Sequence, residues 1–123
     1  GLKTHAKLSL VVRQEGATIK RYVHVGTGNY NPKTARLYED FGLMSSDLVL
    51  GQDVNRLFNQ LSGFAPQTTF QRLLVAPRTI RQGLRDKVQQ EIYNHEKGKP
   101  AYIQIKLNSL LDEDFINLKN YFK

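Results

Sequence analysis

The chain has 123 residues, of which 40% are hydrophobic, so it has the length of one ordinary domain and enough apolar side chains to form a core. It has no cysteine, which excludes disulfides and thiolate chemistry, and no apolar run approaches the roughly 18 residues of a membrane-spanning helix. Six of the seven net positive charges lie in residues 1–36, which hold seven Lys or Arg and the single acid Glu15. Such a segment attracts anions, but charge alone does not choose between nucleic acid, membrane, nucleotide and polyphosphate.

Two strands that form an antiparallel hairpin are predicted at the start of the chain. Apolar residues alternate over 6–12 and again over 17–25, with Arg21 as the exception. Gln14-Glu15-Gly16 lies between them and supplies a tight connection, because glycine adopts positive φ readily. A turn centred on Glu15 and Gly16 collects the apolar residues on one face and predicts the pairs Ala6 with Val25, Lys7 with His24, Leu8 with Val23 and Val12 with Ile19.

A loop is predicted over residues 26–36, followed by a short strand over 37–44 and a helix over roughly 51–62. The helix is indicated by apolar residues at i, i+3, i+4 and i+7, namely Val54, Leu57, Phe58 and Leu61, and by the closing pair Ser62-Gly63. Residues 63–69, with Pro66, have the composition of a linker. We therefore expect a boundary near residue 70, with one domain over 1–70 and a second over 71–123.

The second part of the chain predicts the order strand, helix, strand, helix. The strands are expected at 73–75, before Pro77, and at 101–107. The first helix is indicated by Ile80, Leu84, Val88 and Ile92 and is ended by Gly98 and Pro100, and the last helix is indicated by Asp112 as N-cap and by Phe115, Leu118 and Phe122. This order is typical of an α/β unit, so the predicted fold class is α/β, or α+β for a fragment, with an N-terminal β-hairpin. The chain begins at Gly1 rather than methionine, and we expect it to be part of a longer protein.

His5, Lys7 and His24 are the candidate catalytic groups. Residues two apart on a strand share a face, so His5 and Lys7 lie side by side, and the predicted register puts Lys7 opposite His24. An imidazole titrates near neutrality, so a neutral His5 can attack phosphorus while His24 supplies or removes a proton. A slip of one residue would move His24 to the other face.

The loop that follows is the candidate phosphate-binding segment. Gly26 and Gly28, within Gly26-Thr27-Gly28-Asn29, let the backbone approach closely and expose N–H groups as an anion nest. Lys7, Lys33 and Arg36 supply cations for phosphoryl transfer. Each feature alone is as well explained by an ordinary surface role, and the same H-x-K pattern recurs by chance at His95-Glu96-Lys97. Their coincidence at one end of one hairpin favours phosphate chemistry.

Several runs closely resemble the bacterial polyphosphate kinase family, and together they cover essentially the whole chain. They are Gly1-Leu2-Lys3-Thr4-His5-Ala6-Lys7-Leu8, Arg21-Tyr22-Val23-His24-Val25-Gly26-Thr27-Gly28-Asn29-Tyr30-Asn31, Lys33-Thr34-Ala35-Arg36-Leu37-Tyr38, Leu73-Leu74-Val75-Ala76-Pro77 and Lys106-Leu107-Asn108-Ser109-Leu110.

The resemblance implies reversible transfer of the terminal phosphate of ATP to inorganic polyphosphate through a phosphohistidine. His5 then matches the phosphorylated residue, His24 a second histidine that assists, and Tyr38 a tyrosine that lines the phosphate site. The resemblance also implies phospholipase D-like folds with mixed sheets and flanking helices, with 1–70 ending the first such domain and 71–123 beginning the second.

Further expectations concern ligands and location. Mg²⁺ is expected to arrive with ATP, since no carboxylate cluster with metal-ligand spacing is visible and no metal-binding residue is assigned. The expected partners are ATP, ADP and polyphosphate, and the full-length enzyme is expected to be a homo-oligomer in the cytoplasm, with peripheral contact to the inner membrane left open. Arginines that clamp the nucleotide in the family find no match here, so we expect the isolated chain to be inactive.

Two other function classes stay open at this point. A phospholipase D-like phosphodiesterase would use the same H-x-K and G-T-x-N elements, but Val12 stands where that pattern has an aspartate. A basic nucleic-acid-binding module would interleave aromatic residues with its cations for base stacking, and the basic segment offers only Tyr22 and Tyr30. Nucleic acid is therefore not an expected partner.

Overall fold

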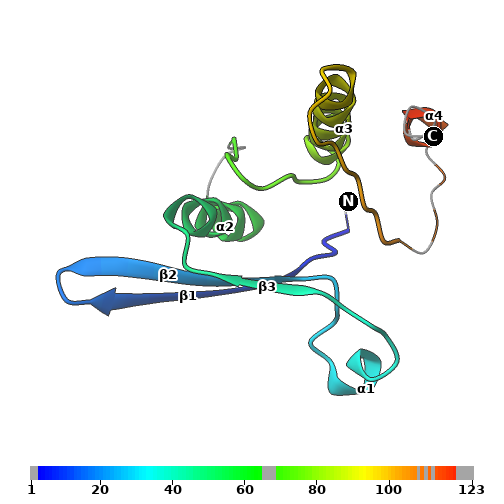
Figure 1. Cartoon of the computed structure of the whole chain (residues 1–123). Coiled ribbons are helices and arrows are strands. Elements are labelled where there is room, and N and C mark those ends of the chain that lie inside the picture. Colours follow the sequence, from blue (N-terminus) through cyan, green and yellow to red (C-terminus); the bar gives the residue numbers. More distant parts are fainter. Residues whose placement is uncertain (1–2, 65–68, 108, 110, 112, 119–123) are drawn as a thin grey trace. The chain divides into compact units, whose positions relative to one another are not determined.

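The computed structural model describes residues 3–64, 69–107, 109, 111 and 113–118. Two compact units are formed, Gly1–Leu73 and Leu74–Lys123 (Figure 1). Residues 65–68 of the expected linker, including Pro66, lie outside the described residues, as do Asp112 and Phe122.

The first unit is built on the predicted hairpin. Strand β1 (Lys7–Glu15) pairs antiparallel with β2 (Thr18–Gly26). Gly16, the first residue of the two-residue turn, has a φ of 60°, as a type II′ hairpin turn requires. The hairpin and the need for glycine at its turn are therefore confirmed.

The register of the hairpin differs from the predicted one. Lys7 pairs with Gly26, and Ser9 rather than Lys7 pairs with His24. The turn is centred on Gly16 and Ala17, one residue later than predicted, which moves each partner by two positions. A shift of two preserves the face of every side chain, so His24 stays on the face opposite the apolar set.

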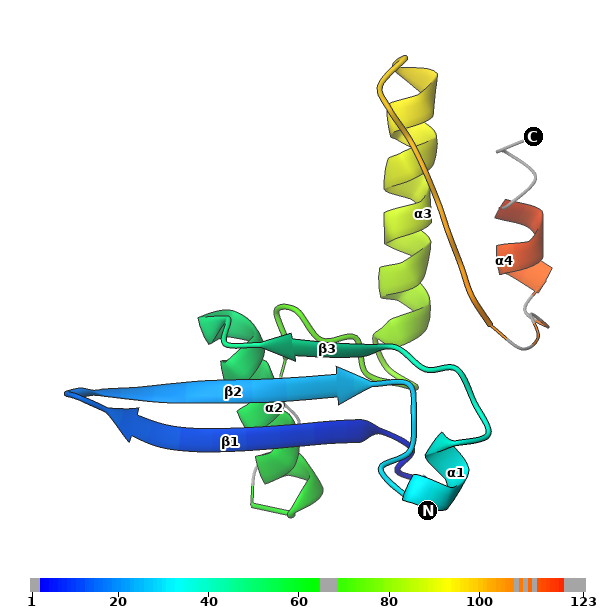
Figure 2. The same cartoon turned by 60° about the horizontal axis from the view of Figure 1, so that its bottom comes forward.

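After β2 the chain forms a single helical turn before a third strand. Helix α1 (Pro32–Ala35) begins after Asn31, whose side chain accepts from the N–H groups of Lys33 and Thr34 at 2.9 and 3.4 Å. Strand β3 (Gly42–Ser45) then pairs antiparallel with the other side of β2, giving the order β1-β2-β3 (Figure 2). The strand predicted over 37–44 is therefore correct only in its second half.

Helix α2 (Leu48–Leu61) lies across one face of this sheet (Figure 1) and forms the core of the unit. Val54 is fully buried, and Leu57 and Val23 of β2 are 8% and 4% exposed. Gly51 brings the helix against Arg21, because a Cβ at this glycine would lie 2.9 Å from the Arg21 Cβ. This explains how Arg21 fits the apolar face, since its aliphatic stem packs under a residue without a side chain.

Asp53 of α2 is completely buried and holds the segment that precedes the second unit. Its Oδ2 accepts from the backbone N–H groups of Gln71, Arg72 and Leu73 at 2.8, 2.6 and 3.1 Å, and its Oδ1 lies 3.4 Å from Arg56. The N–H of Leu73 is thus bonded to a carboxylate. The prediction of a strand over 73–75 is wrong, because this segment is irregular.

The second unit contains helix α3 (Ile80–Glu96) and helix α4 (Glu113–Leu118), as the sequence predicts. Residues 101–107 run alongside α3 (Figure 2), and the N–H of Tyr102 donates to Glu91 at 3.1 Å. The strand predicted there is not formed, because these residues have no strand partner in the described part of the chain. None of the helices described here combines the length and the apolar character needed to cross a bilayer.

Candidate functional site

His5 and Lys7 form an exposed hydrogen-bonded pair at the start of the sheet. Lys7 Nζ lies 2.9 Å from His5 Nε2, and His5 precedes β1 rather than lying within it. An ammonium group has no acceptor, so Lys7 donates and Nε2 accepts. His5 is therefore held with a lone pair on Nε2 and its proton on Nδ1, which is the state that a nucleophilic imidazole needs.

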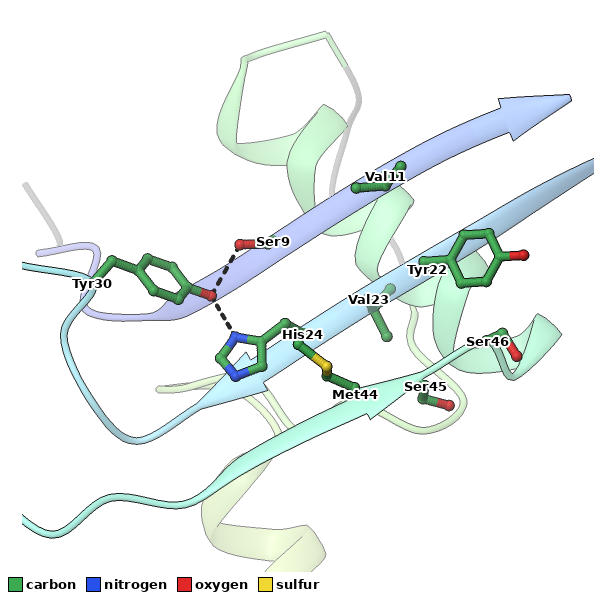
Figure 3. A pocket seen from close by; sticks show the side chains of 9 residues that line it. All are labelled: Ser9, Val11, Tyr22, Val23, His24, Tyr30, Met44, Ser45 and Ser46. Carbon is green, nitrogen blue, oxygen red and sulfur yellow. Dashed lines mark hydrogen bonds between the residues drawn. The ribbon is translucent and has the colours of Figure 1, made fainter.

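His24 is held by the hydroxyl of Tyr30, which is itself hydrogen-bonded to Ser9. Figure 3 shows Tyr30 reaching back from the loop after β2, so that its hydroxyl lies 2.7 Å from His24 Nδ1. Ser9, the partner of His24 on β1, donates its hydroxyl proton to the same Tyr30 oxygen at 3.1 Å. The rings of His24 and Tyr30 are 5.6 Å apart between centroids and are tilted by 47°.

Two paired glycines make room for the His24 ring. Gly26 on β2 and Gly42 on β3 are cross-strand partners. A Cβ on Gly26 would lie 2.9 Å from His24 Cε1, and one on Gly42 would lie 2.6 Å from Nε2. Both distances are shorter than normal contacts, so a side chain at either position would force the His24 ring to shift; neither residue has a positive φ.

The loop after Gly26 is closed by Thr27. Its N–H donates to the carbonyl of Phe41 at 2.9 Å, and its hydroxyl oxygen accepts from the Phe41 N–H at 2.9 Å. The same hydroxyl lies 3.2 Å from Asp40 Oδ1, and the Asp40 carboxylate lies over Gly28. The N–H of Thr27 is therefore bonded within the chain, and phosphate binding by this loop stays a prediction.

The other predicted phosphate-binding residues lie on exposed positions around α1. Asn29 precedes this helix, Lys33 lies within it, and Arg36 is its C-cap. Tyr38, 64% exposed, follows. Their polar groups are open to solvent, as groups that bind an incoming anion must be.

An open pocket of about 580 Å³ lies beside His24 (Figure 3). It is lined by Ser9, Val11, Tyr22, Val23, His24, Tyr30, Met44, Ser45 and Ser46. No Lys or Arg is among these lining residues, so the pocket lacks the cations that a polyphosphate site needs. His24 and Tyr30 thus stand at the edge of a largely apolar hollow, while the cations lie on the β1 start and around α1.

The turn end of the hairpin carries a separate charged cluster. Glu15 accepts from the Tyr22 hydroxyl at 2.6 Å and lies 3.0 Å from Lys20 and 3.3 Å from Arg13. These contacts, led by the Tyr22 hydrogen bond, lower the pKa of Glu15, and Glu15 in turn raises the pKa values of Lys20 and Tyr22. The cluster stabilises the hairpin away from the histidines.

The sequence did not single out Ser9, Tyr30, Asp40 or Gly42 as site residues. Strand alternation does place Ser9 on the face of Lys7 and His24, so the signal for this residue was present. Tyr30 and Asp40 lie in loops, and Gly42 begins β3 directly after a loop, so no periodic pattern indicates where these residues lie. No group of three His, Asp or Glu side chains that could hold a metal ion is found among the described residues.

The comparisons with known proteins agree along most of the chain. Two family models match, polyphosphate kinase C-terminal domain 1 over residues 1–67 and polyphosphate kinase C-terminal domain 2 over residues 73–120. A polyphosphate kinase of Streptomyces coelicolor is 58% identical over 117 residues, covering 95% of this chain and 16% of that protein. One of Parasynechococcus marenigrum is 52% identical over 118 residues, covering 96% of this chain and 17% of that protein.

A solved structure shows the same fold. The crystal structure of polyphosphate kinase from Porphyromonas gingivalis superposes with a TM-score of 0.81 at 36% identity, covering 96% of this chain and 18% of that one. The antiparallel sheet with its helices is therefore the fold of that region of the enzyme, which confirms the predicted fold class. The chain spans about a sixth of the length of the curated relatives it matches. On these matches, the chain belongs to the polyphosphate kinase family.

Proposed function

We propose that these residues act within a longer polyphosphate kinase that moves the γ-phosphate of ATP reversibly onto inorganic polyphosphate through a phosphohistidine on His5. The observation that supports this most strongly is the pair formed by Lys7 Nζ and His5 Nε2 at 2.9 Å. It leaves a neutral, exposed imidazole next to a cation, and phosphoryl transfer needs both a nucleophile and positive charge at the phosphoryl oxygens.

In the first half of the reaction, the Nε2 lone pair of His5 attacks the γ-phosphorus of ATP. A P–N bond forms, the bond to the bridging oxygen breaks, and ADP leaves with the electron pair of that bond. Lys7 must release Nε2 for this attack. Because its side chain is long and only half-buried, it can turn its ammonium from the imidazole to the phosphoryl oxygens, where the charge is carried.

In the second half, a terminal oxygen of the polyphosphate chain attacks the same phosphorus. The P–N bond breaks, and neutral His5 is restored for the next cycle. Lys33, Arg36, Tyr38 and Asn29 are proposed to bind the phosphates, because they are exposed and lie on the turn that follows Gly26-Thr27-Gly28. The Thr27 contacts to Phe41 and Asp40 fix this turn rather than offering donors to an anion.

The proposal is tested by ATP-dependent polyphosphate synthesis, and by the reverse reaction with ADP, in the full-length enzyme. We expect His5→Ala to abolish both directions. His95→Ala is the matched control, because His95 lies in the other H-x-K sequence, at the end of α3. Equal losses in the two variants would contradict the assignment, and hydrolysis of bis-p-nitrophenyl phosphate without kinase activity would favour a phosphodiesterase.

Mg²⁺ is proposed to enter with the nucleotide, as a companion of ATP rather than as a resident of this part of the chain. Homo-oligomer formation, cytoplasmic location and peripheral contact with a membrane stay predictions.

A further inference from the structure

We propose that Tyr30 is a positioning residue for His24, and that its hydroxyl, itself fixed by Ser9, keeps the proton of neutral His24 on Nε2. The catalytic consequence rests on the function proposed above. The tautomer itself rests only on the geometry of these three side chains.

The directions of the two hydrogen bonds at the Tyr30 oxygen determine where His24 carries its proton. Ser9 Oγ donates to Tyr30 Oη at 3.1 Å, so the Tyr30 oxygen already accepts one proton. The proton of Tyr30 is assigned to the shorter of the two contacts of its oxygen, with His24 Nδ1 as the acceptor at 2.7 Å. An imidazole nitrogen that accepts has no proton, and a neutral imidazole has one N–H, so that N–H is at Nε2.

The space around Nε2 supports the same assignment. Gly42 and Gly26 lie against the ring, and a Cβ on Gly42 would lie 2.6 Å from Nε2. Because both residues lack a side chain, the ring has room at its Nε2 end, while Tyr30 contacts the other nitrogen.

This arrangement gives His24 a specific chemical role. In the Nε2–H tautomer, Nε2 has no lone pair and cannot remove a proton. It can donate a hydrogen bond to oxygen atoms that gain negative charge as the phosphoryl group is transferred. When His24 is protonated, Nδ1 also becomes a donor and the Tyr30 oxygen can accept from it, so Nε2 remains a donor in both states. Tyr30 therefore makes His24 a donor rather than a base.

The first test measures the lone pair at His24 directly in the full-length enzyme, without using turnover. Diethyl pyrocarbonate modifies an imidazole nitrogen that has a lone pair. We expect Tyr30→Phe to increase the modification rate of His24 severalfold, because the ring is then free to carry its proton on Nδ1. Peptide mass spectrometry reads the rate at His24 separately from the other histidines, and an unchanged midpoint of urea unfolding shows that the protein has not simply unfolded.

Tyr22→Phe is the matched control for both tests. It removes a hydroxyl from the same face of the sheet, but that hydroxyl bonds Glu15, at the other end of the hairpin. A rate at His24 that is the same in Tyr30→Phe and Tyr22→Phe would overturn the tautomer assignment, whatever the enzyme's reaction is.

The second test asks whether the proton of Tyr30 matters for phosphoryl transfer. We expect Tyr30→Phe to lower kcat about tenfold or more with little change in the KM for ATP, and Tyr22→Phe to leave kcat within a factor of about two. Replacement of Tyr30 by 4-aminophenylalanine, which keeps a donor, should restore much of the rate. O-methyltyrosine, which keeps the oxygen but has no proton, should not. Equal rates with these two residues would overturn the positioning role.

The two proposals fail in different ways. Absence of a phosphohistidine at His5 in the wild-type enzyme would contradict the proposed function, while the modification rates at His24 would still decide the tautomer. A normal phosphohistidine in Tyr30→Phe, formed at the wild-type rate, would contradict the positioning role of Tyr30 alone.

Discussion

At the scale of single residues, the two histidines are held in opposite ways. His5 is paired with the ammonium at the end of the long Lys7 side chain, whereas His24 is held by Tyr30 and packed against Gly26 and Gly42. A nucleophile must move toward phosphorus and carry the transferred group, and a donor must stay where the charge develops. The difference in their surroundings therefore agrees with the different roles proposed for them.

Lys7 provides a test of the proposed charge stabilisation. We expect Lys7→Ala to slow phosphohistidine formation in the full-length enzyme about 100-fold, the size of effect that removal of one positioned charge-stabilising group produces. Lys3→Ala is the control, since it removes the same charge from the same exposed end of the chain. Rapid-quench measurement of labelled enzyme after mixing with ATP gives both rates. Equal effects of the two substitutions would mean that Lys7 contributes only to the overall positive potential of this end of the chain, and not to stabilisation of the reacting phosphoryl group.

The side of the sheet on which His24 lies could be predicted from alternation alone. Its partner could not, because the partner depends on which two residues form the turn. Gln14-Glu15-Gly16 and Gly16-Ala17 are both plausible turns from sequence, and the positive φ of Gly16 at the first turn position decides for the second. Because the observed strand partners differ from the predicted ones by two residues, Ser9 rather than Lys7 lies opposite His24. The Ser9 hydroxyl is then close enough to donate to Tyr30.

At the scale of elements, the hairpin and both long helices followed from periodicity, and the errors fell on elements that depend on distant partners. Residues 73–75 and 101–107 have the composition of strands. A strand also needs a neighbour to bond, and Leu73 instead donates to Asp53, while 101–107 lie along α3. The sequence pattern shows which side chains favour burial, but it does not show which backbone segment will be available as a strand partner.

Asp53 is predicted to be the residue on which the connection after α2 depends. Asp53→Ala would leave three backbone N–H groups without an acceptor, so we expect it to lower the free energy of unfolding by about 3 kcal/mol or more. Asp47→Ala removes the N-cap of the same helix and should cost about 1 kcal/mol. Urea unfolding of both variants gives the comparison. A cost for Asp53→Ala no larger than that for Asp47→Ala would contradict this.

The Glu15 cluster predicts a pH dependence of hairpin stability. Because its contacts lower the pKa of folded Glu15, their contribution is present above the pKa of the unfolded chain and is lost as pH falls through the folded pKa. The raised pKa of Lys20 has the opposite sign, so its contribution is lost at alkaline pH. We expect the stability difference between wild type and Glu15→Gln to shrink as pH falls from about 6 to about 3. A difference that stays constant over this range would contradict the assignment.

At the scale of the whole molecule, the chain carries the proposed nucleophile in a segment that covers about a sixth of its relatives' length. The concentration of charge in residues 1–36 indicated an anion ligand, but it did not identify that ligand. The resemblance to a family came from runs of specific residues, among them those around His5 and His24. Composition and periodicity alone led only to an α/β domain with affinity for anions.

The isolated chain is predicted to bind polyanions without catalysing turnover. It has six net positive charges in residues 1–36, yet no described cluster of cations lines the pocket beside His24. We expect retention on a polyphosphate matrix that falls steeply with salt concentration, since surface charges are screened within about 10 Å at 0.1 M salt. No ATP-dependent polyphosphate synthesis should be detected. Robust synthesis by the purified chain would contradict this account.

The most direct test of the central claim is the mass of the full-length enzyme after incubation with ATP and magnesium. We predict an acid-labile adduct of one phosphate, located on His5 by fragmentation of the peptide, present in His95→Ala and absent from His5→Ala. An adduct that persists in His5→Ala, or that maps to another residue, would contradict the claim that His5 is the nucleophile.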